Sequence, residues 1–186
     1  MRAIIIAGAS VLAACTMAVS GGESASSAQG CQAEAVRTWD VADGGAYIIN
    51  ASSAGPDCQH AVATIVVRDG QNDVLWADAL AVQHTFGLNE ASTPAAMRTA
   101  LEEWIGANTT IMTASELPQW LANTSEPQSG EFPFYPEPEW NDRAAYEEVR
   151  ARNAPMFCYV QGMESMACLA LEHGRLTKIG VQSFPG

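Results

Sequence analysis

The stretch that decides the fold is HAVATIVVRDGQNDVLWADALAVQH, residues 60–84. Two runs of β-branched and apolar residues, 60–68 and 74–84, flank a short polar loop, and this order predicts a β-hairpin. A turn centred on Gln71 places one set of alternate residues on one face: His60, Val62, Thr64, Val66, Arg68, Val74, Trp76, Asp78, Leu80, Val82 and His84. The other face then carries small and aliphatic residues that a helix can approach closely: Ala61, Ala63, Ile65, Val67, Leu75, Ala77, Ala79 and Ala81.

A helix is predicted directly after this hairpin. Ser92 or Thr93 can cap it, Pro94 suits its first position, and Gly106 can end it. Its apolar residues recur with the period of one helical face: Met97, Leu101, Trp104 and Ile105. This face should cover the sheet.

Further elements complete the expected architecture. A second helix is predicted over residues 143–152, with Asp142 as its cap. Short apolar runs predict four more strands, at 46–51, 157–161, 165–172 and 176–184. The order lacks the regular strand–helix–strand alternation of a parallel sheet. It favours an α+β fold with an antiparallel sheet, or sheets, of about six strands and two main helices packed on it.

Composition and charge narrow the classes of function. The chain has 186 residues, of which 48% are hydrophobic and 16% charged, as in globular proteins. Nine Lys and Arg against 21 Asp and Glu give a net charge of -12. Nucleic-acid binding is not expected, because it depends on cationic side chains, and a neutral or basic partner is favoured. No Gly-rich phosphate loop is present, so no cofactor is predicted.

The first residues have the pattern of an export signal. An apolar run at 3–14 follows Arg2 and is too short to span a membrane as a helix. It ends in LAAC, residues 12–15, which resembles the lipobox of bacterial lipoprotein precursors. The resemblance implies cleavage before Cys15 and a lipid on its thiol. Thr16 in the next position implies sorting to the outer membrane, with the domain on the periplasmic side.

The domain boundaries follow from this interpretation. Residues 1–14 are the predicted lipoprotein signal peptide, and 15–30 are small and polar and should act as a flexible tether. Residues 31–186 are expected to form a single globular α+β domain. The alternative is an ordinary signal cut after Ala28, which would release a soluble secreted or periplasmic protein.

Four cysteines remain after Cys15, and an oxidising compartment predicts that they form two disulfides. We expect the local pairs Cys31–Cys58 and Cys158–Cys168, because Cys158 and Cys168 fall opposite each other if 157–161 and 165–169 form a hairpin. The alternative is a copper-like cluster that adds soft ligands to the second pair: Met156, Met163, Met166 and His173.

One group of residues is a candidate metal site. In the predicted hairpin His60 and His84 are diagonal neighbours, and Asp57 precedes the first strand. Two imidazoles and a carboxylate can ligate zinc or supply a base. The alternative is that each is an ordinary surface residue. Ser165 lacks the glycine pattern of a nucleophile elbow, and Asp40 and Asp43 lack the further ligands of a calcium loop.

The segment FPFYPEPEW, residues 132–140, has the most unusual composition in the chain. It should be extended and irregular. Proline-stiffened chain loses little entropy on ordering and aromatic side chains dominate interfaces, so Phe134, Tyr135 and Trp140 are candidate partner contacts. The alternative is a strap that fills the core.

These features favour a membrane-anchored envelope lipoprotein whose domain binds an envelope protein or a small molecule without transforming it. An uncharacterised metal-dependent or hydrolytic enzyme is the second interpretation, and a purely structural envelope protein is the third.

Overall fold

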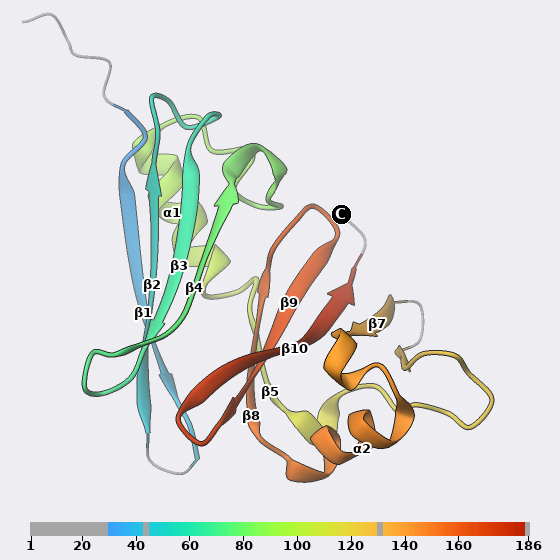
Figure 1. The fold of residues 1–186 in the computed structure, drawn as a ribbon. Coiled ribbons are helices and arrows are strands. Elements are labelled where there is room, and N and C mark those ends of the chain that lie inside the picture. Colours follow the sequence, from blue (N-terminus) through green and yellow to red (C-terminus); the bar gives the residue numbers. More distant parts are fainter. Residues whose placement is uncertain (1–29, 43–44, 130–131, 185–186) are drawn as a thin grey trace, which may run out of the picture.

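The computed structural model describes residues 30–42, 45–129 and 132–184. The predicted signal peptide, Cys15, almost all of the predicted tether and Asp43 lie outside these residues. The described chain forms two antiparallel sheets and two α-helices (Figure 1). The predicted α+β class is therefore confirmed, although the arrangement differs in its details.

The first sheet is a meander of four strands in chain order. Its strands are β1 (Ala33–Asp40), β2 (Ala46–Ala54), β3 (Val62–Arg68) and β4 (Val74–Ala81). The hairpin and the strand at 46–51 are confirmed, whereas β1 was not predicted. Its residues alternate between buried and exposed positions along most of the strand, a period-two pattern typical of a sheet with one solvent face.

The predicted register of the hairpin is wrong by one residue. Ile65 lies opposite Asp78 and Val67 opposite Trp76, with a bulge at Arg68. The loop is not symmetric about Gln71, because the Asp69 carboxylate accepts hydrogen bonds from the N–H groups of both Gln71 and Asp73 (2.9 Å each). A slip of one residue exchanges the faces of a strand. Trp76, Asp78 and Leu80 therefore turn inward, half-buried, while Ala77, Ala79 and Ala81 are exposed.

The second sheet has the strand order β5-β8-β9-β10-β7-β6. Its centre is the predicted C-terminal meander, formed by β8 (Pro155–Val160), β9 (Ser165–Glu172) and β10 (Arg175–Ser183). Short strands from the middle of the chain flank it: β5 (Thr110–Thr113), β6 (Gln128–Ser129) and β7 (Phe132–Pro136). The described residues thus form ten strands instead of the six that were predicted, and the aromatic segment contributes a strand instead of an irregular loop.

Both predicted helices are present, as α1 (Pro94–Trp104) and α2 (Arg143–Arg152). The Thr93 side chain accepts a hydrogen bond from the N–H of Ala96 at 3.1 Å, and the Asp142 carboxylate accepts from two N–H groups of α2. The caps therefore satisfy donors that the first turn of a helix leaves unpaired. Three 3-10 turns complete the described elements: η1 (Val82–His84), η2 (Ala114–Glu116) and η3 (Pro138–Trp140).

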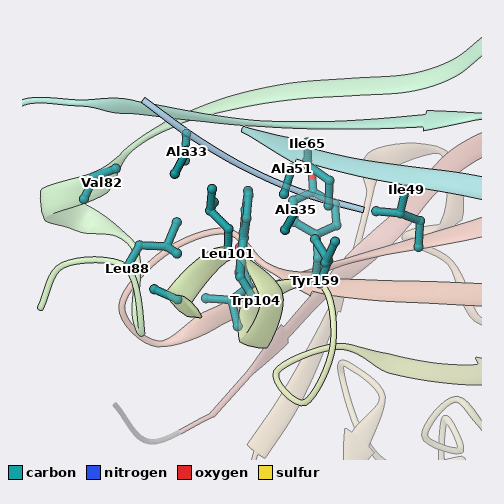
Figure 2. Close-up of a cluster of buried hydrophobic side chains, with 14 of the residues drawn as sticks. Ala33, Ala35, Ile49, Ala51, Ile65, Val82, Leu88, Leu101, Trp104 and Tyr159 are labelled. Atoms are coloured by element: carbon teal, nitrogen blue, oxygen red, sulfur yellow. The ribbon is translucent and has the colours of Figure 1, made fainter. Parts of the chain in front are cut away.

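Helix α1 packs on the first sheet through the predicted stripe. Met97, Leu101 and Trp104 are fully buried. Leu101 and Trp104 face Ala33, Ala35 and Ala51 (Figure 2). The helix packs mainly on β1 and β2, and less on the β3–β4 hairpin whose small residues were expected to receive it. The alanines of β1 and β2 allow the close approach instead.

Helix α2 packs on the second sheet and has a core of its own. Tyr146 and Val149 are buried against sheet residues that include Met156, Ala170 and Ile179. The two helices therefore cover different sheets, rather than one common sheet as predicted.

The two sheets share the larger core. Trp39 of β1 and Phe157 of β8 have ring centroids 5.8 Å apart. The indole N–H of Trp104 donates to the carbonyl oxygen of Val160 at 2.8 Å, which joins α1 to β8. Among the described residues, no helix is long and apolar enough to cross a membrane.

Candidate functional site

The most promising site lies on the face of the second sheet that α2 only partly covers. Along this face Phe134, Gln182, Met166 and Val160 form one cross-strand row. The next row contains Thr110 and the disulfide-bonded cysteines of β8 and β9. Helix α2 packs over the other end of the same face, and cavities lie over the two rows beside it.

Two adjoining cavities occupy this open part of the sheet. The first has a volume of about 210 Å³ and is bounded by Phe86, Asn108, Val160 and Phe184. The second has about 180 Å³ and lies between the sheet and the segment after β5, with Leu117 and Pro118 as one wall and the disulfide at its floor. Thr110 and Met166 line both cavities. We call the two cavities together the trough.

The lining of the trough is apolar, rich in sulfur and almost uncharged. Among the described residues that line it, Glu116 alone has an ionisable side chain. That carboxylate accepts hydrogen bonds from the N–H and the hydroxyl of Thr113, at 2.7 and 3.1 Å. Neutral donors and acceptors come from Thr110, Asn108 and Gln182. Such a surface suits the binding of apolar groups. Its described residues offer no pair of titratable groups for acid–base chemistry.

The candidate metal residues come together only in part. His60 lies in the turn before β3, where its Nδ1 is 2.9 Å from the Asp57 carboxylate, and both side chains are exposed. The hydrogen bonds with His60 lower the pKa of Asp57. His84 lies in η1 and its Nε2 contacts the Gln83 amide. In the described part of the chain, no three His, Cys, Asp or Glu side chains are grouped as metal ligands.

The four cysteines form the predicted pairs. Cys31 is bonded to Cys58, and Cys158 to Cys168, which lie directly opposite each other in β8 and β9. Both thiols of the second pair are thus consumed, and neither is available as a thiolate ligand for copper. His173 lies in the turn between β9 and β10.

The aromatic segment is divided between core and surface. Phe134 is fully buried against Tyr146, and Gly180 of β10 lets it approach, because a Cβ there would lie 2.6 Å from the Phe134 ring. Phe134 is therefore not an exposed contact residue as predicted, although it is among the residues that line the second cavity of the trough. Tyr135 is 48% exposed. Trp140 is half-buried and the Arg152 guanidinium lies over its ring.

A polar bridge crosses the shared core. The Tyr159 hydroxyl donates to the Asp78 carboxylate at 2.7 Å and accepts from the indole N–H of Trp76 at 3.0 Å. Burial, together with the neighbouring Asp78, raises the pKa of Tyr159 far above its ordinary value. The bridge joins β4 to β8 through these two hydrogen bonds.

The trough was not predicted from the sequence. The β-branched residues Thr110, Ile111 and Thr113 are a weak strand signal that could have indicated β5. Nothing in the sequence indicates that this strand lies beside β8. The comparisons add no further evidence: no family model, no curated protein and no solved structure matches the chain.

Proposed function

We propose that this protein is a bacterial envelope lipoprotein whose domain binds an apolar ligand or partner segment in the trough without transforming it. The observation that carries the proposal is the lining of the trough, which offers two apolar cavities and a few neutral polar groups. The binding energy of such a site comes from removing apolar surface from water.

The anchor is the second part of the proposal. The LAAC sequence at residues 12–15 supports a lipid on Cys15 and attachment to the outer membrane, facing the periplasm. Two disulfides support an oxidising compartment. Labelled palmitate should enter the wild-type protein, which should sediment with membranes, and should be absent from Cys15→Ala. A soluble wild-type protein that begins near Gln29 would instead support the ordinary signal peptide.

Binding in the trough can be followed at single methyl groups. The full chain, carried in lipid nanodiscs so that no detergent competes, is labelled at the methionine methyls and titrated with indole as a neutral aromatic probe. Met166 and Met112 line the trough, whereas Met97 is a buried residue of α1. The first two methyl signals should shift and the third should not.

Two tryptophan variants provide the matched test. Thr110→Trp adds a large side chain to the wall that both cavities share and should abolish the indole shifts. Val36→Trp adds the same side chain to an exposed position of β1 and should leave them unchanged. Equal shifts in all three proteins, or none in the wild type, would show that the trough is not the binding site.

A metal-dependent enzyme is the second candidate, and the contact between Asp57 and His60 is the observation that favours it. Stoichiometric zinc in the purified protein, lost in His60→Ala, would support it. Metal-free protein with unchanged trough binding would support the first candidate.

A further inference from the structure

Among the described residues, no strand pairs with the outer edge of β5, beside the trough. Strand β5 is the terminal strand on this side and pairs with β8. The N–H of Ala114, just after β5, donates to the carbonyl oxygen of Ala154 at 2.9 Å. In an antiparallel ladder the residues that exchange such bonds alternate with residues that do not. The register therefore makes Met112 and Thr110 bond to β8, and leaves Ile111 between them with its main-chain N–H and C=O turned outward.

Two further features agree with this assignment. Pro155, which has no N–H to donate, lies opposite Thr113 at a position where the ladder needs no donor. The outward N–H of Thr113 is occupied by the Glu116 carboxylate, which closes that end of the edge. Ile111 remains accessible, with 43% of its surface exposed.

The side chains of an added strand would fall at the trough. Directly opposed residues in a sheet share a face, so residues of an added strand opposite Thr110 and Met112 would lie on the trough face. Thr110 lines both cavities and Met112 lines the second. Alternate residues of an extended chain are about 6.8 Å apart, which is also the spacing of Thr110 and Met112 along β5.

The size of each cavity sets what it can hold. Volumes of about 210 and 180 Å³ are close to the apolar cavity of about 150 Å³ that admits one benzene molecule. Each cavity therefore takes one aromatic or aliphatic side chain, whereas a drug-sized ligand needs about 300 Å³ or more.

We propose that the trough binds an extended peptide segment that adds to the free edge of β5 and inserts two apolar side chains, two residues apart, into the two cavities. This inference rests on the proposed function and names the class of partner. The chain carries a net charge of -12, so neutral or cationic flanking residues are favoured over acidic ones.

The probe is a labelled synthetic peptide, Lys-Thr-Phe-Thr-Phe-Thr-Lys, and its control has the same composition with adjacent phenylalanines, Lys-Thr-Phe-Phe-Thr-Thr-Lys. The full chain in nanodiscs should bind the first peptide, with shifts of the Met112 and Met166 methyls. It should bind the control about tenfold more weakly, because one ring then faces away from the trough.

A proline at the free edge isolates the main-chain contribution. Ile111→Pro removes an N–H that β8 does not use, so the fold is kept, and peptide binding should weaken about tenfold while the indole shifts persist. Ile111→Thr keeps that N–H and should bind the peptide as the wild type does. In wild-type protein, bound peptide should also slow hydrogen exchange at the Ile111 amide, a measurement that does not depend on the folding of any variant.

The outcomes separate the two proposals. Strand addition is overturned if both peptides bind equally well, Ile111→Pro leaves peptide binding unchanged, and the Ile111 amide is not protected. The trough would then remain an apolar binding site. If the wild-type protein binds neither indole nor the peptide, both the proposed function and strand addition are overturned. Spacing-dependent binding with Ile111 protected would establish strand addition.

Discussion

The two sheets differ in how their strands come together. In the first, four consecutive strands lie side by side in chain order. In the second, short strands from residues 110–136 are added to both edges of a later meander. The first sheet's inner face is filled by α1 and the second sheet, whereas α2 leaves part of the second sheet's outer face open. The locally assembled sheet therefore supports the core, and the sheet assembled from distant segments bears the trough.

The largest effect is expected where the two sheets meet. Trp104→Ala removes a fully buried ring that packs against Tyr159 and donates to Val160, so unfolding should become easier by about 4 kcal/mol. The shared core predicts one transition for both sheets. Urea denaturation followed by amide exchange should give the same free energy of opening for β3 and β9.

Trp140→Ala is the control for this substitution. Its ring is half-buried in η3, which contacts α2, and is covered by Arg152, so the loss should be about 1 kcal/mol. Separate transitions for β3 and β9 in the wild type would mean that the sheets fold independently, and the comparison above would then describe two domains.

The disulfide of the first sheet should stabilise the protein more than the disulfide of the second sheet. Cys31–Cys58 joins the start of β1 to the turn before β3 across 27 residues, whereas Cys158–Cys168 links neighbouring strands across 10. Loop-closure entropy predicts losses of about 3.6 and 2.8 kcal/mol for the two Cys→Ala double variants. Denaturation of both variants tests the order. A larger loss for Cys158–Cys168 would mean that the trough floor depends on its disulfide more than chain entropy requires.

The sequence predicted what local rules control and missed what depends on distant pairing. Thr93 and Asp142 marked both helices, and the spacing of Cys158 and Cys168 about Gly162 fixed one hairpin. The register at Gln71 failed because the Asp69 side chain, which a symmetric turn ignores, shapes the loop.

The trough could not be predicted because its walls come from five separate regions of the chain. Phe86, Thr110, Met166 and Phe184 meet only after β5 has paired with β8. The same reason explains Phe134, whose burial requires Gly180 on the neighbouring strand. Its aromatic character alone agreed equally well with an interface and with a core.

Alkaline pH provides the next test, at two buried tyrosines. Burial raises the pKa of Tyr159 in the shared core and of Tyr146 under α2 well above the ordinary value of about 10. The folded state then keeps a proton that the unfolded chain loses. Their contribution to the free energy of unfolding is fully present below about pH 10. Above that pH the free energy of unfolding should fall by about 1.4 kcal/mol per pH unit for each tyrosine.

Phenylalanine variants assign these two contributions. Tyr159→Phe and Tyr146→Phe should each make the alkaline decline shallower by about 1.4 kcal/mol per pH unit, measured by urea denaturation from pH 9 to about 11. Tyr159→Phe should also cost stability at neutral pH, because Asp78 and Trp76 lose their common partner. If the slope is unchanged in a variant, the tyrosine that it replaces ionises as readily in the folded protein as in the unfolded chain.

The smallest effect is expected at the end of α1, where the first sheet holds its helix. The Arg37 guanidinium on β1 donates to the carbonyl oxygens of Ile105 and Gly106, at 2.6 and 3.1 Å, and so places a cation at the helix C-terminus. Arg37→Met should cost about 1 kcal/mol, and Arg37→Lys should recover part of it, because a lysine keeps the charge without the fork of donors. Amide exchange should quicken in the last turn of α1 and remain unchanged in β9. Faster exchange in β9 as well would mean that Arg37 stabilises the second sheet through the shared core, and the division between a supporting sheet and a binding sheet would then be less sharp than the strand order indicates.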